Sequence, residues 1–128
     1  MDNKEFKRLP QSELTVMQGI WELTERGEED IQASSLIHVF PDTIGRFKLT
    51  TVLTLATRLH QKGFISVEKH GRSNCYLPLV AEEDYRRDAA ADFVATVYRS
   101  KPTELFSALC DSGILTDKDI EELKSMLE

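Results

Sequence analysis

Apolar positions recur every three or four residues along the first half of the chain, which predicts three amphipathic helices. We expect the first helix to begin at Ser12, a residue suited to an N-cap, and to stop at Gly27. The second is expected over residues 30–39, because Pro41 prevents its continuation. Residues 41–48 have the composition of a loop.

The third predicted helix starts near residues 48–50, stops at Gly63 and has two contrasting faces. The face with i, i+3, i+4, i+7 spacing carries Val52, Leu55, Ala56 and Leu59. The opposite face carries Thr50, Thr54, Thr57 and Gln61, with Thr51 and Arg58 along one edge and Leu53 and His60 along the other. Threonine is a mediocre helix former, because its β-branch restricts χ1. An outer face rich in threonine therefore calls for a functional explanation.

A short β-hairpin is predicted after the third helix. The two strand-like runs contain Phe64, Ile65, Val67, Cys75, Tyr76 and Leu77, and the sequence HGRSN between them has the glycine and asparagine of a turn. The hairpin tip is basic, with Lys69, His70 and Arg72. Three helices followed by a hairpin is the order of a winged helix-turn-helix domain. The predicted fold class is therefore mainly α with a small β-hairpin.

Residues 81–128 predict three further helices. Their apolar stripes are too large for so short a segment to bury alone, so pairing with a second copy is the simplest way to cover them. We therefore predict a winged helix-turn-helix DNA-binding domain over residues 1–80 and a three-helix dimerisation domain over residues 81–128. The candidate dimer contacts are Tyr85, Phe93, Val97, Leu105, Leu109, Ile120, Leu123 and Leu127.

Charge is distributed unevenly along the chain. The net charge is −6, but residues 43–78 hold six Lys/Arg against one Asp/Glu, while residues 1–42 hold four against nine. A basic middle segment is the electrostatic footprint of a nucleic-acid site, which the overall acidity hides. Threonine hydroxyls reach base edges and threonine methyls pack on thymine methyls, while flanking cations suit phosphates. The segment therefore predicts contact with double-stranded DNA.

Other classes of function find little support in the residues. No apolar run is long enough to cross a bilayer, and the first ten residues lack the apolar segment of a secretory signal. The two cysteines, Cys75 and Cys110, and the three histidines show no metal-ligand spacing, and no catalytic motif is present. We therefore expect a cytoplasmic protein without membrane insertion, and no enzyme activity, cofactor or metal.

Three stretches together resemble a known family of regulators: LPQSELTVMQGIW, LTTVLTLATRLHQKGFISVEKHGRSNCYLPLVAEEDY and TDKDIEELKSML. They are similar to the penicillinase and methicillin-resistance repressors and their copper-responsive relatives, the BlaI/MecI/CopY type. The resemblance implies a homodimeric repressor of antibiotic-resistance genes that reads a dyad-symmetric operator through its third helix and wing. The DNA-binding roles that it implies fall on Lys48, Thr50, Thr51, Thr54, Arg58 and Arg72.

The sequence departs from the family pattern in three respects. Leu53 stands where the family usually has Lys or Arg, which predicts a different operator, and residues 27–48 form a longer connection than expected. The position where β-lactam-responsive members are cut, an Asn–Phe bond, corresponds here to Ala108–Leu109. The cysteine cluster of the copper-responsive members is absent. The resemblance admits a membrane sensor-protease pathway as a further partner, with cleavage at Ala108 and Leu109.

Two alternatives remain open from sequence. One is a winged helix used as a protein-interaction module, which net acidity and a neutral threonine face would suit. The other is a ligand-sensing regulator without β-lactam-linked proteolysis, although no residue pattern marks its pocket.

Overall fold

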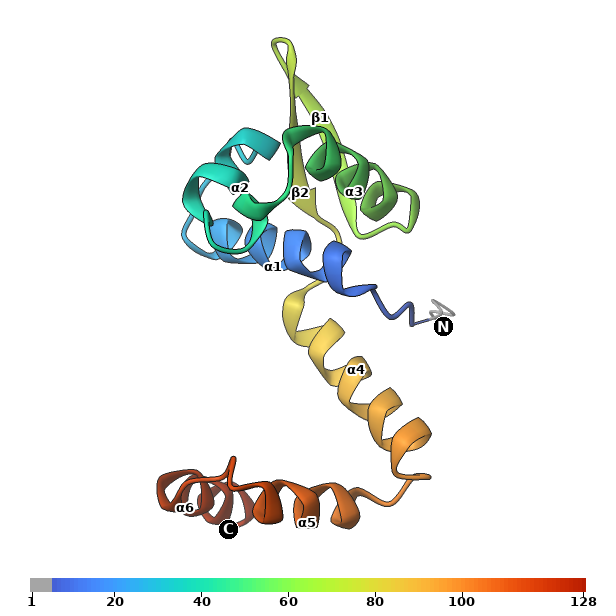
Figure 1. Ribbon diagram of the computed structural model, residues 1–128, viewed down its shortest axis with the longest axis vertical. Coiled ribbons are helices and arrows are strands. Elements are labelled where there is room, and N and C mark those ends of the chain that lie inside the picture. Colours follow the sequence, from blue (N-terminus) through green and yellow to red (C-terminus); the bar gives the residue numbers. More distant parts are fainter. Residues whose placement is uncertain (1–5) are drawn as a thin grey trace. The chain divides into compact units, whose positions relative to one another are not determined.

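The computed structural model describes residues 6–128, which form six α-helices, one short 3-10 helix and one two-stranded antiparallel sheet (Figure 1). The elements are α1 (Gln11–Glu25), α2 (Ala33–Val39), η1 (Ile44–Arg46), α3 (Leu49–Gln61), β1 (Ile65–His70), β2 (Ser73–Pro78), α4 (Glu82–Val97), α5 (Pro102–Ser112) and α6 (Asp117–Leu127). This architecture confirms the predicted fold class. The chain divides into two compact units, with the boundary between Arg86 and Arg87.

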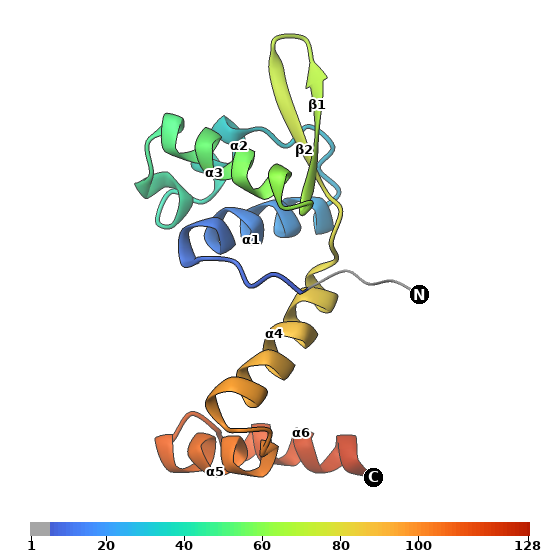
Figure 2. The same ribbon diagram turned by 90° about the vertical axis from the view of Figure 1, so that its right-hand side faces the viewer.

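The first unit is built around one apolar core. Helix α1 packs on α3 and β2, while α2 packs on α3 and η1. The fully buried side chains come from helices, connections and strands: Val16, Met17, Ile20, Ile31, Leu36, Ile44, Val52, Leu59, Ile65 and Cys75. Gly19 lets α1 approach η1 closely, because a Cβ there would lie 2.5 Å from the Ile44 Cδ1 atom. The β1–β2 hairpin extends beyond the three helices (Figures 1 and 2).

The start of α1 differs slightly from the sequence prediction. The helix begins at Gln11 with Pro10 in the N-cap position, rather than with Ser12 as the cap. The Pro10 carbonyl accepts the first helical hydrogen bond, from the Leu14 N–H at 2.9 Å. Proline suits this place because its fixed φ and missing N–H cost nothing at a helix start.

The start of α2 lies three residues later than predicted. The Gln32 N–H donates to the Ser35 hydroxyl at 3.1 Å as half of a capping box, which fixes the first helical residue at Ala33. The preceding segment instead runs beside β2, where the Tyr76 N–H donates to the Ile31 carbonyl at 2.8 Å. The predicted loop before α3 contains the single turn η1.

Tyr85, at the start of α4, belongs to the core of the first unit. Its ring lies 5.6–5.8 Å, centroid to centroid, from those of Phe6, Trp21 and Phe64, and its hydroxyl accepts the Leu9 N–H at 2.9 Å. Only 6% of Tyr85 is exposed. The sequence prediction assigned Tyr85 to the dimer contacts, whereas here its ring and hydroxyl are engaged within its own unit.

The second unit, residues 87–128, contains no buried apolar side chain. Val97, Met126 and Leu127 are 56%, 74% and 88% exposed. Helix α6 begins with a capping box: the Asp119 N–H donates to the Thr116 hydroxyl at 3.1 Å, and the Thr116 N–H donates to the Asp119 carboxylate at 2.9 Å. Within the described part of the chain, no helix is long and apolar enough to span a bilayer.

Candidate nucleic-acid interface

The outer face of α3 is exposed as the hydrophobic pattern predicts. The inner residues Val52, Leu55, Ala56 and Leu59 are buried against the first unit's core. The exposed residues are Thr50, Thr51, Leu53, Thr54, Thr57 and Arg58. The inner face fixes the rotation of the helix, so the threonine face points into solvent.

Two threonine hydroxyls on this face donate their only proton within the helix. Thr54 Oγ1 donates to the Thr50 carbonyl and Thr57 Oγ1 donates to the Leu53 carbonyl, both at 3.0 Å. A hydroxyl has one proton and two acceptor lone pairs, so each of these oxygens can only accept from an outside molecule. The methyl group of each side chain remains available for apolar contact. The face therefore offers fixed acceptors and methyl groups.

Cations lie at the margins of the α3 face. Lys48 occupies the N-cap position, and Arg58 is exposed in the last turn. Arg72 is exposed in the hairpin turn beside Gly71, whose φ of +69° suits a residue without a side chain. Among residues 6–128, no ion pair involves Lys48, Arg58 or Arg72. Their charges are therefore available to an outside anion.

One cation of the basic middle segment has an internal role instead. The Lys62 ammonium, just after α3, donates to the Glu13 carboxylate at 2.5 Å. The Glu13 side chain is only 3% exposed and the Lys62 side chain 32%. This pair joins the first turn of α1 to the C-terminus of α3, and it fixes the α3 face relative to the core. Sequence reasoning did not identify this pair, because its two members lie far apart along the chain.

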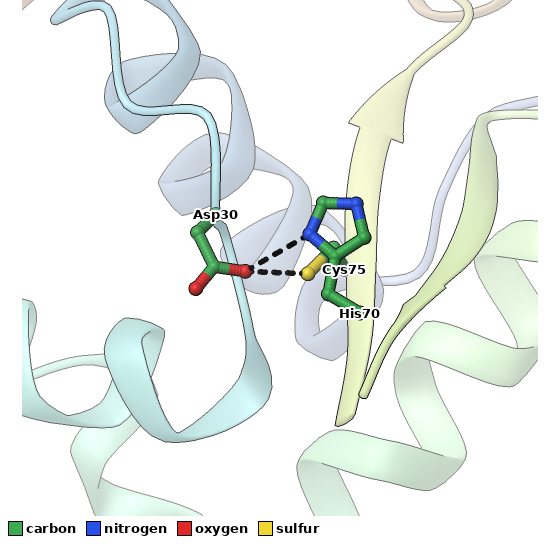
Figure 3. Close-up of side chains that lie close together, drawn as sticks. All are labelled: Asp30, His70 and Cys75. Atoms are coloured by element: carbon green, nitrogen blue, oxygen red, sulfur yellow. Dashed lines mark hydrogen bonds and ion pairs between the residues drawn. The ribbon is translucent and has the colours of Figure 1, made fainter. Parts of the chain in front are cut away.

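The turn end of the hairpin contributes to a polar cluster that sequence reasoning missed. The Cys75 thiol donates to Asp30 Oδ1 at 2.6 Å, and His70 Nδ1 lies 3.4 Å from the same oxygen (Figure 3). Burial, followed by the Asp30 contact, raises the pKa of Cys75 to about 11. The same hydrogen bond, with one from Gln32, lowers the pKa of Asp30.

The register of the hairpin is what brings these residues together, and the spacing of residues along the sequence does not reveal that register. Glu68 pairs with Cys75 and His70 pairs with Ser73, so all four residues share one face of the hairpin. His70 and Cys75 are therefore diagonal neighbours across the two strands. Asp30 reaches them from the segment that lies beside β2, and no local pattern predicts that contact.

Comparison with known proteins places this arrangement among bacterial repressors. A family model described as penicillinase repressor matches residues 9–128. The methicillin resistance regulatory protein MecI of Staphylococcus aureus (strain N315) is 30% identical over 127 residues, which cover 99% of this chain and 98% of that protein. The penicillinase repressor of Bacillus licheniformis is 27% identical over 126 residues, covering 96% and 94%. The solution structure of the DNA-binding domain of the repressor BlaI matches with a TM-score of 0.50 and 28% identity, covering 64% of this chain and 93% of that one.

Three packed helices with an exposed third helix and a basic hairpin define a winged-helix protein, the fold shared with that DNA-binding domain. The match extends through both units of the chain. The protein belongs to the penicillinase repressor family. This membership confirms the resemblance inferred from the sequence motifs. The family consists of DNA-binding transcriptional repressors, which are not enzymes, as the sequence predicted for this chain.

Proposed function

We propose that the protein is a homodimeric transcriptional repressor that binds double-stranded DNA through α3 and the β1–β2 wing. The observation that carries the proposal is the α3 face, in which fixed threonine acceptors are flanked by exposed cations that form no ion pair with residues 6–128. Repression would follow from occupation of a promoter. Family membership supports a DNA-binding repressor. The homodimer and the dyad-symmetric operator go beyond it and are part of this proposal.

The chemistry of the α3 face suits the major groove. Thr54 can accept from an adenine or cytosine amino group, and its methyl can pack on a thymine methyl. Thr50 and Thr51 lie one turn earlier on the same exposed surface. Leu53 is 41% exposed between them and adds an apolar contact where a charged residue would bind guanine. We therefore expect an operator that is read through thymine methyls and amino groups.

Phosphate contacts would hold the helix in register. No described side chain caps the N-terminus of α3, so its first-turn N–H groups and the Lys48 ammonium can face one phosphate. Arg58 would contact the backbone from the other end of the helix. Arg72 at the wing tip would contact the adjacent backbone or minor groove.

The second unit would pair two copies. Residues 87–128 bury no apolar side chain, although their helices carry apolar residues at helical spacing. We assign dimer contacts to Phe93, Val97, Leu105, Leu109, Ile120, Leu123 and Leu127, all of which are half-buried or exposed. A two-fold pair would place two α3 helices in successive major grooves, about 34 Å apart.

Cleavage within the second unit is a separate matter from DNA binding. Ala108 and Leu109, the position suggested by resemblance, lie inside α5 and are half-buried. A protease needs extended backbone, so a cut there would require α5 to open first. The proposed repressor function does not depend on this step.

The salt dependence of DNA binding tests the proposal. Arg58→Ala removes one phosphate contact, so we expect weaker binding to all duplexes and a log–log salt slope smaller by about one unit. The matched control is Lys124→Ala, which removes an exposed cation from α6. Fluorescence anisotropy between about 50 and 200 mM salt measures the affinity and the salt slope of each variant. Equal slopes for wild type and Arg58→Ala would show that the α3 face does not contact DNA.

A further inference from the structure

We propose that Asp30, His70 and Cys75 form a binding site for a divalent transition metal ion, and that Zn²⁺ is the ion this ligand set favours (Figure 3). The three residues come from the segment before α2 and from both strands of the wing. Their ligand atoms, one carboxylate oxygen, one imidazole nitrogen and one sulfur, all lie within 4.8 Å of one another.

The spacing of these atoms suits a tetrahedral ion. Zinc ligands at about 2.0–2.3 Å from the metal lie roughly 3.3–3.8 Å from one another. The contact between Asp30 Oδ1 and His70 Nδ1 is already 3.4 Å, while the contact between Asp30 and the Cys75 sulfur, at 2.6 Å, must open slightly. This adjustment falls on Asp30, whose side chain is 62% exposed, and the His70 side chain, at 49% exposed, can follow it. The buried Cys75 can remain in place.

The chemistry of the donors selects the kind of ion. A thiolate and an imidazole favour zinc and similar borderline-soft ions over Mg²⁺ or Ca²⁺, which prefer oxygen ligands. Binding would break the Cys75 S–H bond, release its proton to solvent and form a sulfur–metal bond. Three protein ligands leave a fourth position, which the exposed side of the cluster opens to water.

Glu68 completes the surroundings of the site. Its carboxylate lies 3.7 Å from His70 Nε2, on the side of the ring away from Asp30. A carboxylate in this place draws the imidazole proton to Nε2 and leaves the Nδ1 lone pair for the metal. Because Glu68 also stands opposite Cys75 in the hairpin register, it adds negative charge that favours a cation there.

The ion would tie the wing to the body of the first unit. Asp30 lies outside the hairpin, whereas His70 ends β1 and Cys75 lies within β2. A metal bridge between them would restrict movement of the hairpin tip, where Arg72 lies. This consequence rests on the proposed DNA-binding function, and it predicts that Zn²⁺-loaded protein binds duplex DNA more tightly than chelator-treated protein.

Cobalt titration of the reduced, metal-free full chain tests the site without DNA. We expect one Co²⁺ per chain, a near-ultraviolet thiolate-to-cobalt absorption band, and displacement of the ion by Zn²⁺. Cys75→Ser keeps a hydrogen-bond donor for Asp30 but should abolish the band. His70→Asn should weaken Zn²⁺ binding at least about tenfold. The matched controls are Cys110→Ser, an exposed cysteine on α5, and His38→Gln on α2, both of which should bind as wild type.

Three results would overturn the proposal. One is the absence of saturable Co²⁺ or Zn²⁺ binding, and another is a band that survives in Cys75→Ser. The third is a band that disappears in Cys110→Ser, which would place the ion on the second unit. Duplex binding by chelator-treated protein is then measured separately, so failure of the metal site is distinguishable from failure of the DNA-binding function.

Discussion

At the level of single residues, the threonines of α3 combine an intrahelical hydrogen bond with the recognition role that we propose for them. Each of Thr54 and Thr57 uses its only hydroxyl proton within the helix, in a bond to the carbonyl one turn back that does not improve helix propensity. The same bond fixes the rotamer and turns the oxygen into a defined acceptor. In the proposed complex, a residue that is a mediocre helix former would thereby present a fixed acceptor to base edges.

Replacement of Thr54 by valine isolates the hydroxyl from the methyl. Thr54→Val keeps the shape but removes the acceptor, so we expect the preferred base at one operator position to change, by about 1 kcal/mol or more in discrimination. The salt slope should not change. Thr96→Val is the matched control, because Thr96 donates to the Asp92 carbonyl at 2.8 Å in the second unit. Binding-site selection followed by sequencing measures the preference. An unaltered preference would remove Thr54 from the reading surface.

The Glu13–Lys62 pair predicts an asymmetric loss of stability. Lys62→Met leaves a carboxylate that is 3% exposed without its cation and should cost about 3 kcal/mol. Glu13→Gln leaves an ammonium group that can reach solvent, so it should cost roughly 1 kcal/mol. Urea unfolding of the two variants gives the comparison. Equal small losses would mean that the pair does not hold α1 against α3.

At the scale of elements, sequence predicted those features that depend on local periodicity and turn chemistry. The two faces of α3 and the hairpin both follow from nearby residues. The position of Tyr85 could not be predicted, because contacts distant in sequence decide it. The start of α2 follows from the local Gln32–Ser35 cap together with the contact of Ile31 to Tyr76, which is distant in sequence. Likewise, only strand register brings His70 and Cys75 together, and only a separate segment supplies Asp30.

The cap of α6 predicts a pH-dependent helix start. Hydrogen bonds from the Thr116 backbone N–H and then its hydroxyl lower the pKa of Asp119 from its ordinary value of 3.8. A lowered pKa means that the carboxylate stabilises the fold above pH 3.8, and that this contribution is lost as pH falls through the lower folded value. We expect the Thr116 amide NMR shift to titrate below pH 3.8. Asp119→Asn should abolish the transition; a midpoint at or above 3.8 in the wild type would argue against the cap.

At the scale of the whole molecule, the basic surface belongs to the first unit and the exposed apolar helices belong to the second. The first unit has a complete core and a basic, threonine-rich exposed helix, while the second has exposed apolar residues without a core of its own. This division explains how an acidic chain with a net charge of −6 can belong to a family of DNA-binding repressors. In the proposed dimer, a local basic surface would determine the encounter with DNA, and the second copy would supply bivalency.

Hydroxyl-radical footprinting on fragments that the protein selects from genomic DNA tests these two properties together. For wild type we expect two protected segments on one face of the duplex, related by a dyad and separated by about one helical turn. Leu127→Asp, at a residue 88% exposed, should leave the first unit folded but remove the paired protection. Leu79→Asp, at a residue 58% exposed in the first unit, is the control. A wild-type protein that protects no segment, or only a single segment without a dyad, would contradict a dimer that reads DNA through α3.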